Sequence, residues 1–94
     1  MSGFSTESGN YKNLTATGAV TTGQGALLGF YVNSTTAGTL VLRDGGAGGT
    51  VMCGTITPAV GFHRFPAGFG SGGLHATVGG TLDVTFLFSP TPGA

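Results

Sequence analysis

The sequence predicts an all-β protein: a single small antiparallel β-sandwich or jelly-roll-like barrel of about seven or eight short strands, with extended termini. Apolar and polar residues alternate with a period of two along most of the 94 residues, and no stretch shows the apolar periodicity of a helix. Segments rich in Gly, Pro, Asn and Ser separate these runs at the short, regular spacing typical of sandwiches and barrels. No segment could form the crossover helix that parallel strands need, so the strands are expected to be antiparallel.

The expected strands follow one another in short, similar lengths. In chain order they are residues 11–18, 27–33, 39–44, 50–56, 61–65, 73–78 and 82–88. In the last, LDVTFLF, every second residue from Leu82 to Phe88 is apolar, which predicts a buried core stripe. Asp44-Gly45 predicts a hairpin, because such a turn needs the positive φ that glycine adopts readily.

The domain organisation follows from the same pattern. Residues 1–10 are polar apart from one aromatic and are expected to form an N-terminal arm. Residues 11–88 form the β-sandwich domain, and the proline-spaced residues 89–94 form a C-terminal tail. Such ends are poorly ordered unless a neighbour ties them down.

Apolar residues on the faces opposite the core stripe predict a second buried surface. They are Leu27, Tyr31, Val41 and Leu87. A sheet face turned toward water normally carries polar groups. A subunit interface would cover these residues, and partial cover by loops is the alternative.

The charge content points the same way. Only 6% of the residues are charged and the net charge is zero, whereas soluble domains average about 25% charged residues. Because zero net charge promotes association, we expect copies of the chain or a partner to cover much of the surface. The alternative is a monomer wetted by its many threonines.

The same counts exclude several partners. Three scattered basic residues, balanced by three acids, cannot form the phosphate-binding stripe of a nucleic-acid protein. No apolar run approaches the roughly 20 residues that a membrane helix needs. The N-terminal residues lack the features of a signal peptide, and one cysteine gives no disulfide framework, so we expect synthesis in a cytoplasm.

Three motif matches have simpler explanations. Residues 68–73, GFGSGG, match the glycine spacing of a dinucleotide-binding loop. A true fingerprint opens a helix, whereas the residues that follow alternate and contain Gly-Gly, so the segment is interpreted as a loop. The N-x-[ST] patterns at Asn13 and Asn33 are interpreted as chance in a Thr-rich chain without a leader.

The candidates for catalysis are Cys53, His63 and His75. A Cys–His pair can form a nucleophile and base, provided that the fold brings in an orienting group such as Asp83. Their spacing fits no zinc pattern, and Asp44 alone supplies too few oxygen ligands for calcium. Three acids leave no carboxylate pair for glycoside hydrolysis. We therefore expect no enzyme, no cofactor and no metal, with the cysteine packing as a small apolar residue.

Three segments carry a resemblance to a known class of proteins: ATGAV at 16–20, GTLVLRDG at 38–45 and GLHATVGGTLDVT at 73–85. Over roughly residues 13–88 the chain resembles small all-β virion structural proteins of tailed phages, found among head-decoration (cement) and tail- or spike-associated components. The resemblance implies a sandwich or barrel that assembles, often as a trimer, on a capsid lattice or tail. It implies location in the virion after synthesis in the bacterial host cytoplasm, and it carries over no catalytic residue.

The expected function is therefore a capsid decoration protein that clamps adjacent subunits of the major capsid protein as a homotrimer. The candidate capsid contacts lie in and after the N-terminal arm: Phe4, Tyr11 and Lys12. The alternative is a tail- or head-fibre or spike component, or a receptor- or glycan-binding tip. For that alternative the aromatic platform near the Gly-rich loop would be Phe62, Phe65 and Phe69.

Overall fold

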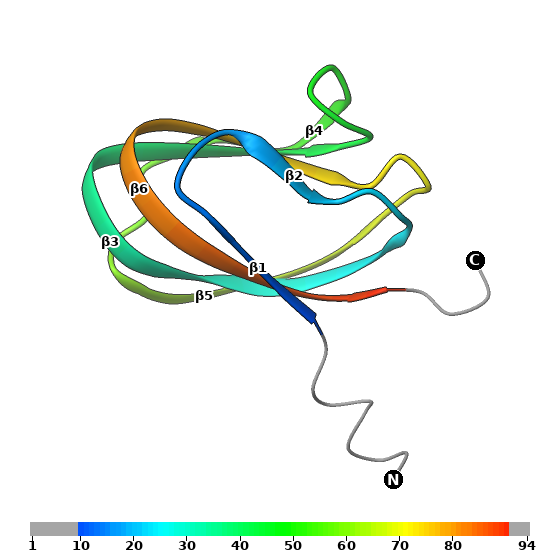
Figure 1. Cartoon of the computed structure of the whole chain (residues 1–94), viewed down its shortest axis with the longest axis horizontal. Helices are drawn as coiled ribbons and strands as arrows, with labels where there is room; N and C mark the ends of the chain where they lie inside the picture. Colours follow the sequence, from blue (N-terminus) through cyan, green and yellow to red (C-terminus); the bar gives the residue numbers. More distant parts are fainter. Residues whose placement is uncertain (1–9, 91–94) are drawn as a thin grey trace, which may run out of the picture.

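The computed structural model describes residues 10–90, and within that range the chain forms six antiparallel strands and no helix (Figure 1). The strands are β1 (Asn10–Leu14), β2 (Gly18–Thr21), β3 (Gly25–Asp44), β4 (Thr50–Ile56), β5 (Gly61–Phe69) and β6 (Leu74–Pro90). The predicted all-β, antiparallel class is confirmed. In the described part of the chain there is no helix long and apolar enough to cross a membrane.

Two long strands form the frame of the molecule. β3 has 20 residues and β6 has 17, and they pair from Gly25 opposite Pro90 to Asp44 opposite Leu74. The prediction of seven or eight short strands is wrong here, because residues 27–33 and 39–44 belong to one strand. Likewise, residues 73–78 and 82–88 fall almost entirely within β6.

A bend replaces each turn that the sequence predicted between those segments. The pairing of β3 with β6 shifts register between Val32 and Ser34 and again between Thr36 and Thr39, and Ala37 has a φ of 54°. The strands approach closely at this point, since a Cβ on Gly38 would lie 2.7 Å from the carbonyl oxygen of Thr81. Glycine and irregular register therefore bend two continuous strands instead of ending them. Figure 1 shows β3 and β6 curving together at one end of the molecule.

Each half of the bent pair has two further strands beside it. β1 pairs with the last part of β6, and β5 pairs with the first part of β3. β2 pairs with the first part of β6, and β4 pairs with the last part of β3. β2 was not expected, since the sequence assigned residues 11–18 to one strand and the following residues to a turn. The described sheet begins at Asn10 and ends at Pro90, so it extends slightly into both expected termini.

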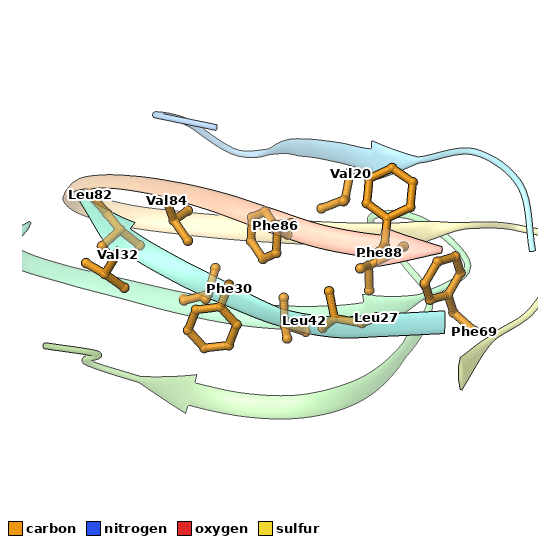
Figure 2. Packing of buried hydrophobic residues seen from close by; sticks show 13 residues of the cluster. Val20, Leu27, Phe30, Val32, Leu42, Phe69, Leu82, Val84, Phe86 and Phe88 are labelled. Atoms are coloured by element: carbon orange, nitrogen blue, oxygen red, sulfur yellow. The ribbon is translucent and has the colours of Figure 1, made fainter. Parts of the chain in front are cut away.

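The core lies on the inner side of the bent sheet. Its buried apolar residues are Val20, Leu27, Phe30, Val32, Leu40, Leu42, Phe69, Leu74, Ala76, Leu82, Val84, Phe86 and Phe88. The predicted stripe from Leu82 to Phe88 is confirmed, because all four of its apolar members are at most 6% exposed. Figure 2 shows core side chains of β3 and β6 gathered close together, and the ring centroids of Phe30 and Phe86 lie 5.9 Å apart.

Two Gly-rich loops close the end of the sheet opposite the bend. The predicted Asp44-Gly45 hairpin is confirmed: Asp44 pairs with Thr50, and Gly45 has a φ of 104°. The last four residues of GFGSGG form the turn from β5 to β6. The Asp44 carboxylate accepts a hydrogen bond from the Gly70 N–H at 3.0 Å, and the Gly45 N–H donates to the Gly73 carbonyl at 2.9 Å. The loop interpretation holds, and Asp44 fastens the two loops together.

Phe86→Ala tests this packing. Phe86 is fully buried between β1 and β3, so its truncation is expected to lower the free energy of unfolding by about 3–5 kcal/mol. The matched control is Tyr11→Ala: Tyr11 is 76% exposed, and the change should cost within about 0.5 kcal/mol. Urea denaturation followed by circular dichroism measures both. Equal losses for the two variants would contradict the described core.

Candidate binding face

One side of the sheet carries most of the exposed large apolar side chains. It is the outer side of the half formed by β1, the last part of β6, the first part of β3, and β5. Tyr11 is 76% exposed, Phe62 51%, Tyr31 45% and Leu28 43%. We define the outer face as Tyr11, Asn13, Leu28, Tyr31, Asn33, Phe62, Arg64, Asp83, Thr85 and Leu87. Of the six charged residues in the sequence, Arg64 and Asp83 lie on this face.

Tyr31 lies at the centre of the outer face. Its Cα partners are Phe62 on β5 and Thr85 on β6. Thr85 in turn pairs with Asn13 on β1. These four residues form a row across four strands, with two aromatic rings at one end and polar groups at the other.

Gly29 creates the space that the Phe62 ring occupies. A Cβ at position 29 would lie 2.7 Å from Cζ of Phe62 and 2.6 Å from the carbonyl oxygen of His63. The glycine is itself buried, because the neighbouring ring lies over it. Phe62 is therefore held against the sheet beside Tyr31 instead of pointing freely into water.

A polar cluster occupies the other side of the outer face. The side-chain amide of Asn13 donates to Oδ1 of Asp83 at 2.7 Å and to Oγ1 of Thr85 at 3.0 Å. The amide of Asn33 donates to the same two atoms, at 3.2 Å and 3.0 Å. The two asparagines reach β6 from β1 and from β3, so the cluster ties three strands together. The sequence signalled both residues only as N-x-[ST] patterns.

The predicted interface residues do not share one surface. Leu27 is fully buried in the core, so its placement on an outer side is wrong. The register shifts between Leu27 and Gly29 against both neighbouring strands, which turns Leu27 inward and leaves Leu28 exposed. Tyr31 and Leu87 do lie together on the outer face. Val41 lies beyond the bend of β3, on the outer side of the other half of the sheet.

The predicted aromatic platform is also only partly exposed. Phe69 is 4% exposed and belongs to the core, and Phe65 packs against it. The expectation for these two residues is wrong because β5 continues to Phe69 and its alternation turns both of them inward. Phe62 alone of the three is exposed, and its neighbour is Tyr31 rather than the Gly-rich loop.

The candidate capsid contacts lie at the start of the sheet. Phe4 lies outside the described residues. Tyr11 and Lys12 are both exposed on β1. Tyr11 is opposite Leu87 on the outer face, whereas Lys12 is opposite Phe86 and points to the other side of the strand.

The three candidates for catalysis, Cys53, His63 and His75, lie in the sheet and do not come together with Asp83. The His63 ring stacks on the core residue Phe30, with centroids 5.2 Å apart, and its Nε2 donates to the Ala59 carbonyl at 2.7 Å. Asp83 lies on the opposite side of the sheet, so it does not orient this histidine. Cys53 on β4 packs against the core, and His75 lies on β6 between β2 and β3. Between residues 10 and 90 there is no pocket and no group of three or more potential metal ligands.

Comparison with known proteins gives no further assignment. No protein-family model, curated protein or solved structure matches the chain.

Gly29→Ala tests whether the Phe62 ring packs over position 29. The added methyl group meets both the ring and the His63 backbone, so we expect a loss of about 1–3 kcal/mol in unfolding free energy. The control is Gly54→Ala on β4, where a Cβ would meet nothing within 4 Å and the change should be neutral or slightly stabilising. Thermal and urea melts compare the two variants. A neutral Gly29→Ala would show that Phe62 does not occupy this position.

Asp83→Ala tests the polar cluster. It removes the acceptor that both asparagine amides share, and the expected cost is about 1–2 kcal/mol because each net hydrogen bond is worth about 1 kcal/mol. Ser34→Ala is the control, since Ser34 is exposed and lies directly opposite Asp83. Equal urea midpoints for the two variants would contradict the stabilising role of the cluster.

Proposed function

We propose that this chain is a non-enzymatic structural protein of a phage virion, and that it works by assembly through its outer face. The observation that carries the proposal is the concentration of four exposed large apolar side chains on one side of a sheet. They belong to a chain in which only 6% of the residues are charged. Contiguous apolar patches on soluble proteins mark interaction sites.

Assembly would remove the apolar side chains of the outer face from water. Burying apolar area gains roughly 25 cal/mol per Å², so a neighbour that covers the outer face is favoured over water. In a virion many copies are bound on one symmetric particle, and avidity allows each contact to be weak. A subunit that binds only the assembled shell also stabilises that shell by mass action.

Within this class, a capsid decoration protein fits best with the resemblance noted in the sequence. The two halves of the bent sheet would be the two layers of a small sandwich. Tyr11 and Lys12 are exposed on the strand that follows the N-terminal residues, and they would contact the major capsid protein together with Phe4. Copies of the chain would contact one another as well as the shell.

A second function is favoured by one specific observation. Tyr31 and Phe62 lie side by side, next to the amides and carboxylate of the polar cluster. Sugars are bound by aromatic faces combined with amide and carboxylate groups, so the outer face would suit the glycan-binding tip of a fibre or spike. Binding of the isolated protein to host-cell glycans, abolished by Tyr31→Ala, would favour this alternative.

Virion binding tests the main proposal. The purified protein is added to capsids that lack it, prepared from the phage whose genome encodes it. The fraction of protein bound to the capsids is measured by co-sedimentation. We expect saturable binding by the wild type and at least about tenfold weaker binding by Tyr31→Ala/Phe62→Ala, because losing the anchors of the outer face weakens assembly and with it the avidity of the bound copies.

The control is Val60→Ala, because Val60 is 61% exposed and lies outside the outer face. It should bind like the wild type. Absence of the chain from virions, or equal binding by all three proteins, would refute the proposal.

A further inference from the structure

The outer face carries two charges of opposite sign. Arg64 on β5 is exposed. Oδ1 of Asp83 on β6 accepts hydrogen bonds from the side-chain amides of Asn13 and Asn33. The other eight residues of the outer face are uncharged. A face with one positive and one negative group is neutral as a whole, so a copy of itself does not repel it.

These two charges lie diagonally on opposite sides of Tyr31. Phe62 is the neighbour of Tyr31 on β5, and Arg64 follows it by two residues, toward Gly29. Thr85 is the neighbour on β6, and Asp83 precedes it by two residues, toward Ser34. Arg64 therefore lies one strand away from Tyr31 on one side, and Asp83 lies one strand away on the other side. Along the strand direction, each is two residues from the direct neighbour of Tyr31, and the two displacements point in opposite directions.

The two charges are too far apart to pair within one chain. With strands about 4.8 Å apart and about 6.8 Å per two residues, their Cα atoms are separated by roughly 17 Å. An arginine and an aspartate side chain together do not bridge that distance. Among residues 10–90, the outer face therefore offers Arg64 no carboxylate partner within its own chain, and Asp83 of another molecule can supply one.

We propose that the outer faces of two copies pack against each other about a two-fold axis that passes by Tyr31. This inference rests on the proposed assembly role and names the partner of the same face. A two-fold interface is isologous, so Arg64 of each copy contacts Asp83 of the other, and the single pair of charges makes two ion pairs. Tyr31 packs on Tyr31 of the second copy at the centre.

The packing also accounts for the apolar residues. Two sheets stacked face to face lie about 10 Å apart and interdigitate their side chains. Tyr31 and Phe62 would form the dry centre, and the ion pairs would fix the orientation of one sheet on the other. Charge pairs of this kind act mainly on specificity and register. The product is a dimer, whereas the trimer implied by the resemblance would need a different surface.

Charge reversal with mixing tests the pairing. Arg64→Glu and Asp83→Lys each bring like charges together in their own homodimer, so each is expected to dissociate at least about tenfold more readily than the wild type. When the two variants are mixed, the glutamate introduced at 64 meets the lysine introduced at 83, and the native Asp83 meets the native Arg64. The mixture should therefore form heterodimers at wild-type concentrations. Sedimentation velocity with one variant labelled measures this.

Two controls separate charge from geometry. Lys12→Glu makes the same charge change as Arg64→Glu on a side chain that points away from the outer face, and it should dimerise like the wild type. Arg64→Lys keeps the charge and should retain most of the association. Circular dichroism confirms that each variant is folded.

Several results would overturn the inference: a wild type that is monomeric or exclusively trimeric, or folded variants that do not recover association on mixing. If Asp83→Lys does not fold, because it loses the asparagine contacts, Arg64→Glu alone decides, and unchanged dimerisation refutes the pairing. Capsid binding is scored separately. A chain that forms these dimers but never enters virions would refute the proposed function and leave the dimer standing.

Discussion

The pairing of β3 with β6 along their whole length is the interaction on which the rest of the structure depends. It joins Gly25 to Pro90 at one end and Asp44 to Leu74 at the other. Every other strand pairs with one of these two. The bend around residues 34–38 then decides which side chains become core and which become surface, because it turns the inner sides of the two halves toward one another.

The outer face is a product of that frame. Tyr31 is exposed because it alternates with Phe30 and Val32, which the bend places in the core. Phe62 lies beside it because β5 pairs with the same part of β3 and because Gly29 leaves room for the ring. A surface with aromatic groups at one end and a hydrogen-bonded amide cluster at the other therefore needs no loop to build it. Its residues all lie on strands of the sheet.

The sequence was informative where the physics is local. Alternation over LDVTFLF predicted the buried stripe, and Asp44-Gly45 predicted the hairpin, because each depends on a few adjacent residues. It was misleading where the outcome depends on a neighbouring strand. The shift at Leu27 and the continuation of β5 to Phe69 are set by pairing, so Leu27 and Phe69 were placed on the wrong side. The cluster of Asn13 with Asp83 joins residues 70 positions apart, and no local pattern encodes that meeting.

The long pairing of β3 with β6 also has a kinetic meaning. The first residues of β3 pair with the last residues of β6, from Val32 opposite Val84 to Gly25 opposite Pro90, so this part of the central pair cannot form until those β6 residues have been synthesised. Bringing β3 and β6 together closes a long loop of chain, and this costs conformational entropy before the strand contacts form. All-β proteins with such long-range pairing fold on a scale of milliseconds to seconds. During that interval the apolar segments of β3 are exposed in a chain with few charges to keep copies apart. Folding and self-association therefore compete for β3, and pairing of β3 with β6 ends the competition.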